Sequence, residues 1–286
     1  MIESLCVAIP KTIVPRGTSK EIQRFERVTG IKKTRRFAGS TLEMIYRALD
    51  AAKLSQETLE QIQQVIVVTQ TPDRFSPCLA VSVHDYLKLD SKVMAFDINR
   101  ACDGWVFGIR LANKMLFKTL LICADRLRYE PNELESLIFS DAVSVSVIEP
   151  SWARFYGFTD GAKAEQLYCG IDGKMHMDGE SVFDFVINHI PPLVESLDKQ
   201  NWLCPHQPNL SMLKILESRT GYQGKMLYSI EEYGNQSMNS IPCALAANEE
   251  KILGQSVLCV GFGAGFTATA AAFNWASVKV SSIVEV

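Results

Sequence analysis

The feature that most constrains this chain is one cysteine, Cys102, between a predicted buried strand and a predicted helix. Val93 to Ile98 is a short apolar run, and from Trp105 onward apolar residues recur at helical spacing. A thiol at a helix N-terminus meets free backbone N–H groups and the positive end of the helix dipole, and both favour the thiolate. Gly104 permits a tight turn that lets the sulfur face a cavity. These features predict a nucleophile. The alternative is a buried structural cysteine, which is common in proteins.

Composition limits the classes of protein that this chain can belong to. At 286 residues it is long for one core, which suggests two modest domains or one duplicated domain. Its net charge of −3 gives no basic excess for nucleic-acid binding. The eight cysteines are scattered without a CxxC pair, so we expect neither disulfides nor a metal site, and a reducing cytoplasm is the expected compartment. We find no signal peptide and no apolar run long enough to cross a bilayer, so no membrane partner is expected.

Predicted strands alternate with predicted helices, which favours an α/β fold with helix-covered sheets. The second half repeats the pattern of the first, which suggests an internal duplication with the active site between the halves. We expect one half over residues 1–150, carrying Cys102, and a second over residues 151–286. The predicted strands are 5–9, 65–69, 93–98, 120–124, 143–148, 202–204 and a last buried strand at 257–260, and the predicted helices are 19–28, 41–53, 77–87, 105–116, 182–197 and 210–220.

Two polar residues of the second half are candidates to assist the cysteine. His206 follows a short predicted strand and has Pro205 and Pro208 near it on either side. The prolines exclude regular hydrogen bonding, so the imidazole is expected on a defined loop at a strand's carboxyl end, where α/β sheets build sites. Asn235 follows a glycine in a predicted turn, and a neutral amide there could donate a hydrogen bond. The alternatives are a satisfied core histidine and ordinary turn chemistry.

A stretch of small residues, Gly261 to Thr267, follows the last predicted strand. Its glycines let the backbone approach a ligand closely. The stretch lacks the lysine of a P-loop and the GxGxxG spacing of a dinucleotide site, so we favour a backbone N–H that serves an oxyanion hole. The basic run Lys32 to Arg36 has two interpretations, which are a solvated face and a docking patch for an anionic partner.

Five stretches resemble, in family order, the motifs of β-ketoacyl-ACP synthase III-type condensing enzymes of the thiolase fold. They read VTGIKKTRRF, FDINRACDGWVFGIRLA, CPHQPNLSML, YGNQSMNSIPCAL and GFGAGFTATAA, and they spread over nearly the whole chain. The resemblance implies a duplicated, layered αβαβα fold. It also implies that Cys102 is the acylated nucleophile and that His206 and Asn235 handle the malonyl carboxylate and the thioester carbonyl.

The same resemblance implies the remaining site residues. The backbone N–H groups of Cys102 and Ala264 match the oxyanion hole. Phe75 matches a residue that reaches across a dimer interface to shape the neighbouring acyl pocket, so a homodimer is implied. Phe262 and Gly263 fall at substrate-binding positions. No metal or organic cofactor is implied, and the expected partners and substrates are acyl carrier protein and coenzyme A thioesters.

The chain departs from the family pattern where coenzyme A binds. Arg24 replaces a tryptophan that stacks on the adenine, and Val28 replaces a nearby arginine. The glycine-rich GDGAGA segment reads SDAVSVSV at residues 140–147. The arginine after the histidine motif is Ser211, which leaves Lys214 as a substitute that binds substrate. These changes suggest a specialised relative that acts on an unusual acyl donor, for which delivery by a carrier protein is one option.

We therefore expect an acyltransferase that condenses its acyl-cysteine with a malonyl thioester by decarboxylative Claisen chemistry, in fatty-acid or specialised acyl biosynthesis. Two alternatives are transfer of the acyl group to an amine or alcohol, and a non-catalytic subunit that supports an active homologue. Asn235 favours condensation over simple transfer, and the complete Cys–His–Asn set argues against the subunit. The alternating tail from Val278 to Val284 is assigned no function.

Overall fold

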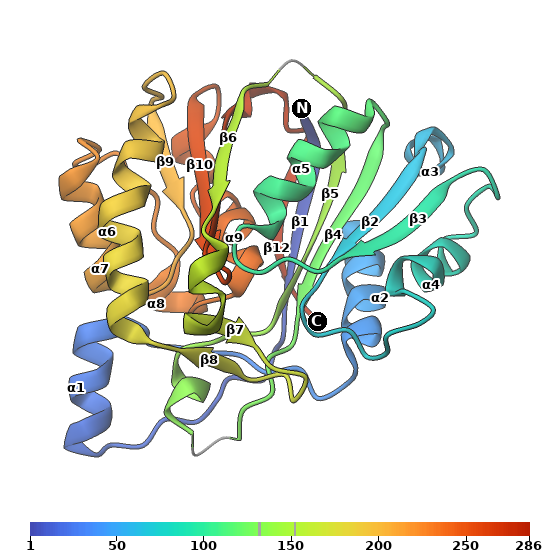
Figure 1. The fold of residues 1–286 in the computed structure, drawn as a ribbon. Coiled ribbons are helices and arrows are strands. Elements are labelled where there is room, and N and C mark those ends of the chain that lie inside the picture. Colours follow the sequence, from blue (N-terminus) through green and yellow to red (C-terminus); the bar gives the residue numbers. More distant parts are fainter. Residues whose placement is uncertain (131–132, 152) are drawn as a thin grey trace.

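The computed structural model describes residues 1–130, 133–151 and 153–286 of the chain. It has five layers, in which two β-sheets separate three layers of helices (Figure 1). Each sheet buries both faces against helices, as short continuous apolar strands require. The layered αβαβα arrangement is therefore confirmed.

The first sheet contains six strands in the order β12-β1-β5-β4-β2-β3. The strands β3, β2 and β4 run parallel, whereas β5 is antiparallel to both β4 and β1. The predicted strands of the first half are confirmed, with ends that differ by a few residues. The bounds are β1 Ile2–Ile9, β2 Gln64–Val68, β3 Met94–Ile98, β4 Thr119–Asp125, β5 Ala142–Ile148 and β12 Val280–Glu285.

The second sheet has the order β6-β11-β10-β9, and residues 225–227 add a short fifth position beside β9 through a parallel bridge between Leu203 and Met226. The strands of each half can be numbered from first to fifth in chain order. Across the sheet, both halves then show the same order, which is third, second, fourth, fifth and first. In the first half these are β3, β2, β4, β5 and β1, and in the second half they are residues 225–227, β9, β10, β11 and β6. This repeat supports an internal duplication, while the boundary at residue 150 stays a prediction. The bounds are β6 Phe155–Thr159, β9 Trp202–Pro205, β10 Ser256–Gly263 and β11 Thr267–Asn274, and a separate hairpin comprises β7 Leu167–Cys169 and β8 Met175–Met177.

Helices α5 (Gly104–Met115) and α9 (Ser240–Ala247) lie between the sheets and contact both. Helices α2 and α4 cover the outer face of the first sheet, and α6 covers that of the second with α7 beside it (Figure 1). The remaining bounds are α1 Lys20–Thr29, α2 Thr41–Ala52, α3 Gln56–Gln61, α4 Leu79–Tyr86, α6 Gly179–Glu195, α7 Leu210–Arg219, α8 Ile230–Tyr233 and α10 Glu249–Ile252, with 3-10 helices η1 Leu134–Leu137, η2 Gly161–Gln166, η3 Ser237–Asn239 and η4 Trp275–Ser277. Over the described ranges, no helix combines the length and apolar character that a membrane crossing requires.

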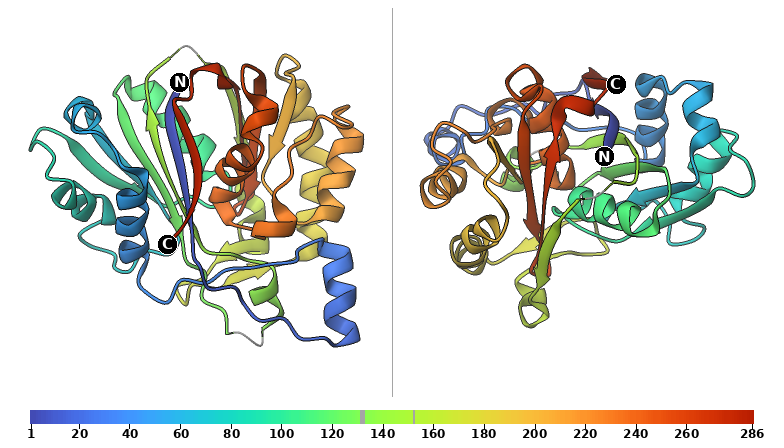
Figure 2. Two further views of the ribbon diagram at one scale, coloured as in Figure 1. Left: turned by 180° about the vertical axis from the view of Figure 1, so that it is seen from behind. Right: turned by 90° about the horizontal axis from the view of Figure 1, so that it is seen from above.

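Two strands near the end of the chain were not predicted. The expectation that residues 257–260 form the last buried strand is wrong, because β11 follows and pairs antiparallel with β10. Its sequence TATAAAFN is poor in the residues that favour strands. Its alanines divide between the two faces of the strand: Ala268 and Ala270 pack in the apolar cluster that contains Phe185 of α6, and Ala271 packs in the cluster that contains Trp105 of α5. The tail forms β12, which lies parallel to β1 along the edge of the first sheet (Figure 2).

Candidate active site

Cys102 lies in the turn between β3 and α5, as predicted, and only 7% of its surface is exposed. The backbone of β10 passes directly against it. A Cβ atom built on Gly263 would lie 2.8 Å from the Cβ and 3.0 Å from the Sγ of Cys102. Only glycine permits this approach without displacing the cysteine. The cysteine of the first half therefore faces a strand of the second half.

Ser237, in η3, brings the three candidate residues together. Its Oγ lies 3.8 Å from the Sγ of Cys102. Its backbone N–H donates to the Oδ1 of Asn235 at 2.9 Å, and its backbone also contacts the imidazole of His206. Sequence reasoning missed Ser237, because its position depends on a left-handed backbone with φ of 52° that no local pattern announces.

His206 occupies the predicted loop directly after β9 and is buried. Its backbone N–H donates to the carbonyl of Val260 at 2.9 Å, and its ring meets that of Phe262 edge-on, with 5.3 Å between centroids. Within the described residues, its Nδ1 has no hydrogen-bond partner. Burial lowers the pKa of His206 to about 3, although the backbone of Ser237 opposes the change. The ring is therefore neutral at pH 7 and offers one N–H donor.

Asn235 is fixed by residues 138–140 of the first half. Its backbone N–H donates to the carbonyl of Ile138 at 2.9 Å, and its carbonyl accepts from the N–H of Ser140 at 2.8 Å. Because its Oδ1 already accepts the N–H of Ser237, the orientation of the amide is set. In the described part of the chain its Nδ2 has no acceptor, so the amide can donate to a ligand.

The resting state of Cys102 differs from the sequence expectation. The pKa of the Cys102 thiol is raised to about 12, chiefly by burial; the hydroxyl of Ser237 opposes this rise, and the carboxylates of Asp125 and Asp103 contribute to it. The expectation that the helix N-terminus favours the thiolate is therefore wrong for the resting site. The physical reason is that burial penalises the charged form more than the helix end stabilises it.

Two backbone donors beside the sulfur remain unused. The N–H groups of Cys102 and Ala264 donate to no other group within the described residues. Ala264 directly follows Gly263, which presses against the cysteine. Two free donors beside a nucleophile are consistent with an oxyanion hole, and this assignment stays a prediction.

A buried carboxylate lies behind the site. Asp125, at the end of β4, accepts hydrogen bonds from the backbone N–H of Gln70 at 3.0 Å and from its Nε2 at 2.7 Å. The same Nε2 lies 3.0 Å from the Oγ of Ser237. Burial raises the pKa of Asp125 to about 6, although the hydrogen bonds from Gln70 lower it. Across the described residues, no cluster of His, Cys, Asp and Glu could hold a metal ion.

Several known proteins are similar to this chain. A family profile described as 3-Oxoacyl-[acyl-carrier-protein (ACP)] synthase III C terminal matches residues 196–275. The beta-ketoacyl-[acyl-carrier-protein] synthase III of Acholeplasma laidlawii is 30% identical over 275 residues, which cover 86% of this chain and 87% of that protein. Its counterpart in Clostridioides difficile is 30% identical over 291 residues, covering 86% of this chain and 88% of that protein. The chain belongs to the β-ketoacyl-[acyl-carrier-protein] synthase III family.

Solved structures of synthase III proteins share the fold. The 3-oxoacyl-(acyl-carrier protein) synthase of Burkholderia xenovorans LB400 matches with a TM-score of 0.88 and 24% identity, over 100% of this chain and 96% of that one. The synthase III of Thermus thermophilus matches with a TM-score of 0.84 and 25% identity, over 97% of this chain and 99% of that one. The thiolase-type fold is therefore confirmed.

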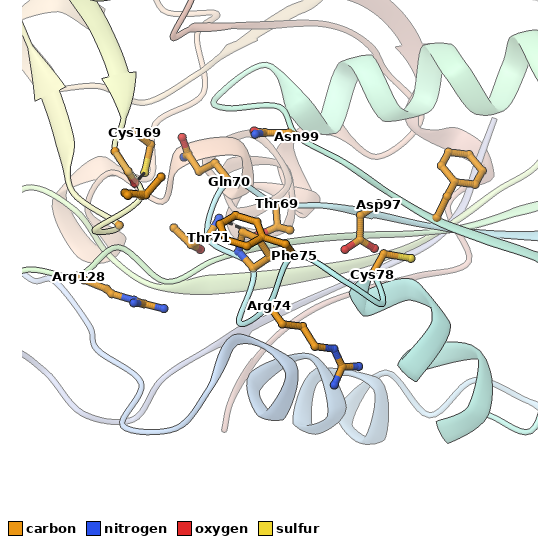
Figure 3. A pocket seen from close by; sticks show the side chains of 15 residues that line it. Thr69, Gln70, Thr71, Arg74, Phe75, Cys78, Asp97, Asn99, Arg128 and Cys169 are labelled. Atoms are coloured by element: carbon orange, nitrogen blue, oxygen red, sulfur yellow. Dashed lines mark hydrogen bonds between the residues drawn. The ribbon is translucent and has the colours of Figure 1, made fainter.

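Phe75 of this synthase III chain lies apart from its own Cys102. The side chain is 92% exposed, on the loop between β2 and α4. It lines a cavity of about 550 Å³ together with Phe96 and Ile171, and Figure 3 labels Phe75 among the side chains that line this cavity. An aromatic side chain that is exposed to solvent is typical of a residue that contacts another molecule.

The residues expected to replace the coenzyme A contacts lie on the outside of the molecule. Arg24 and Val28 are exposed on α1. The Nζ of Lys214 lies 3.3 Å from a carboxylate oxygen of Glu217 and 4.6 Å from the ring centre of Tyr228, rather than at the catalytic candidates. The structure therefore does not bring Lys214 together with the three residues around Ser237.

The cations of the basic run form ion pairs, while the choice between a solvated face and a docking patch stays a prediction. Each cation of the run faces a carboxylate from a distant segment, and most of these carboxylates come from the second half. The N–O distances are 2.6 Å for Lys32 to Glu231, 2.7 Å for Lys33 to Glu232, 3.4 Å for Arg35 to Glu232 and 3.8 Å for Arg36 to Asp141. The run thus connects α8 of the second half to the first half, and within the first half it contacts Asp141 at the start of β5.

Proposed function

We propose that this synthase III chain forms an acyl-cysteine on Cys102 and condenses the acyl group with a malonyl thioester, with release of CO₂. The observation that most supports the proposal is the gathering of Cys102, His206 and Asn235 around Ser237. A nucleophile, a neutral imidazole and a free amide donor lie in one buried site. The family name of the relatives describes the same condensation.

Acylation begins with attack of the Cys102 sulfur on the carbonyl of an acyl thioester. The sulfur–carbon bond forms, the carbonyl oxygen becomes an oxyanion, and the backbone N–H groups of Cys102 and Ala264 stabilise it. Collapse of the oxyanion breaks the bond to the leaving sulfur. The proton lost by Cys102 ends on that sulfur, so the free thiol of the donor is released.

The condensation step uses the neutral hydrogen-bond donors of His206 and Asn235. Loss of CO₂ from the malonyl thioester leaves an enolate, whose oxygen His206 and Asn235 stabilise through N–H donation. The enolate carbon attacks the acyl-cysteine carbonyl, and the oxyanion again forms beside Ala264. Collapse releases the β-ketoacyl thioester, and Cys102 takes up one proton. A neutral imidazole suits this role, because it donates a hydrogen bond without retaining the carboxylate that must leave.

We further propose that the acyl donor is delivered by a carrier protein and that the chain works as a homodimer in a reducing cytoplasm. The exposed Arg24 and the engaged Lys214 support the first point, since neither is poised for a nucleotide at the site. The exposed Phe75 supports the second. All eight cysteines are free thiols, which supports the third.

Intact-protein mass spectrometry tests the function. The chain is incubated with a panel of acyl-CoA and acyl-carrier thioesters beside Cys102→Ala. We expect an added acyl mass in the parent that is absent from the variant, and its disappearance when a malonyl thioester is supplied, with a β-ketoacyl product. Asn235→Ala should still acquire the acyl mass but lose condensation roughly 100- to 1,000-fold, because one enolate donor is missing.

Other outcomes separate the alternatives. Release of the acyl group to an amine or alcohol, with no reaction toward malonyl thioesters, would replace condensation with simple transfer. A folded parent that takes no acyl mass from any donor would overturn both enzymatic functions in favour of a supporting subunit.

A further inference from the structure

A fully buried carboxylate directly follows the nucleophile. Asp103 is 0% exposed and occupies the N-cap position of α5, yet its side chain caps no helix N–H. Its two oxygens instead accept from Arg100 Nε at 2.9 Å and from the Nη2 of the same arginine at 2.7 Å. They also lie 3.1 Å from the hydroxyl of Thr267 and 2.8 Å from that of Thr269. We call Arg100, Asp103, Thr267 and Thr269 the Asp103 clamp.

The clamp joins the two segments that carry the oxyanion donors. Arg100 and Asp103 flank Cys102, whereas the threonines lie on β11, after the turn that contains Ala264. The hydroxyl of Thr267 also lies 3.0 Å from the carbonyl oxygen of Ala264. A chain of direct contacts therefore runs from the cysteine turn to Ala264.

The backbones of the two segments are pressed together at the same place. A Cβ atom on Gly261 would lie 2.5 Å from the Cα of Asp103, closer than real Cβ atoms approach. Gly263 makes the corresponding contact with Cys102. Glycines thus allow the close approach, and the clamp supplies the attraction that holds it.

The charge of Asp103 argues against a role in activating the sulfur. A carboxylate beside Cys102 opposes formation of a second negative charge. A buried carboxylate is also costly unless its partners satisfy it, and this one has two charge-assisted bonds to Arg100, the hydroxyl of Thr269 as a donor, and the hydroxyl of Thr267, whose one proton is shared between Asp103 and the carbonyl of Ala264. The arrangement fixes geometry at the expense of thiolate stability.

We propose that the Asp103 clamp is a positioning device that holds the backbone N–H groups of Cys102 and Ala264 at the spacing at which both bind one oxyanion. The inference rests on the proposed acyl transfer to Cys102. The residues of the Asp103 clamp act through the backbone N–H donors and do not touch the substrate.

The test compares two reactions of the same sulfur. Acylation by a thioester passes through an oxyanion, whereas alkylation by iodoacetamide is a direct displacement of iodide that forms none. In the double variant Thr267→Val with Thr269→Val, which keeps shape but removes both hydroxyls, we expect acylation to slow roughly 10- to 100-fold. Alkylation of this variant should stay within about twofold of the parent, and the double variant Thr267→Ser with Thr269→Ser, which retains the hydroxyls, should restore acylation.

Three results would overturn the proposal that the Asp103 clamp positions the oxyanion donors. These are acylation of the valine variant at the parental rate, a parallel loss of acylation and alkylation, and a serine variant as slow as the valine variant. If the valine variant does not fold, Arg100→Gln is measured in both reactions with the same criteria. Failure of the proposed function is distinguishable, because then the parent itself would show alkylation but no acylation.

Discussion

At the scale of single residues, burial dominates the chemistry of the site. The end of a helix stabilises a charge by about 2 kcal/mol at most, which corresponds to roughly 1.5 pKa units. Full burial can shift a pKa by about 3–5 units in the opposite direction. The raised pKa of Cys102 and the lowered pKa of His206 both follow from this imbalance. The resting site therefore holds a thiol and a neutral imidazole.

Burial of Asp125 predicts a pH-dependent loss of stability. Its pKa is raised to about 6 in the folded chain from an ordinary value of 3.8. The folded state therefore holds the proton more tightly, and stability falls as pH rises from about 4 to 6. The difference in free energy of unfolding between Asp125→Asn and the parent should change by about 3 kcal/mol in favour of the variant as the pH rises from about 4 to 6. Above about pH 6 this difference should stay constant.

Urea unfolding from pH 4 to 8 measures this difference. Asp198→Asn is the matched control, since Asp198 is 87% exposed and its substitution removes no buried carboxyl group. A difference between Asp125→Asn and the parent that does not change with pH would contradict the prediction.

At the scale of elements, β12 gives the tail a structural role. Its side chains alternate, so that Ile283 packs against the core between the sheets and Val284 packs against the core beneath α2 and α4. The strand also covers an edge of β1 whose backbone groups would otherwise lack partners. The tail thus completes the first sheet.

Removing both side chains should destabilise the fold but spare the chemistry. For Ile283→Ala with Val284→Ala we expect a loss of about 3 kcal/mol, because two half-buried aliphatic side chains are truncated. Acylation of Cys102 should stay within about twofold of the parent. Lys279→Ala is the control, since it breaks only an exposed ion pair with Glu3 and should cost less than about 1 kcal/mol. Unchanged thermal and urea unfolding of the double variant would contradict the assignment.

At the scale of the whole molecule, one face has features that support the proposed homodimer. The strand β3 forms an edge of the first sheet, and Met94 at its start is exposed. Phe75 and Ile171 are 92% and 98% exposed on the same cavity. An open edge beside large exposed apolar side chains is typical of an interface, and a two-fold axis would make the face complementary to itself.

Phe75→Asp should convert the dimer to a monomer. A charge placed at the centre of an apolar interface must lose its water, so the association constant should fall at least 100-fold. Sedimentation equilibrium would then report the 31.9 kDa mass of one chain instead of twice that mass. Leu253→Asp, at a 62% exposed position outside this face, should remain dimeric. A Phe75→Asp variant with the parental mass would contradict the proposed interface.

The local features of this protein could be predicted from the chain's residues alone. The apolar run before Cys102, the helical spacing after it and the prolines around His206 each depend on neighbours within a few residues. Such patterns fix strands, helices and loops because backbone hydrogen bonding and turn geometry are local. The motifs in family order then indicated the layered fold and its condensing residues.

The contacts between residues that are far apart in the sequence could be read only from the folded structure. Cys102 and Ser237, or Asp103 and Thr269, come together through the packing of turns and helices between the two sheets, which no local pattern encodes. The same holds for β12 beside β1 and for Lys214, which meets Glu217 and Tyr228 instead of the site. The ionisation of Cys102 was also beyond the sequence, because desolvation depends on everything that packs around a group, and that is set only when the chain has folded.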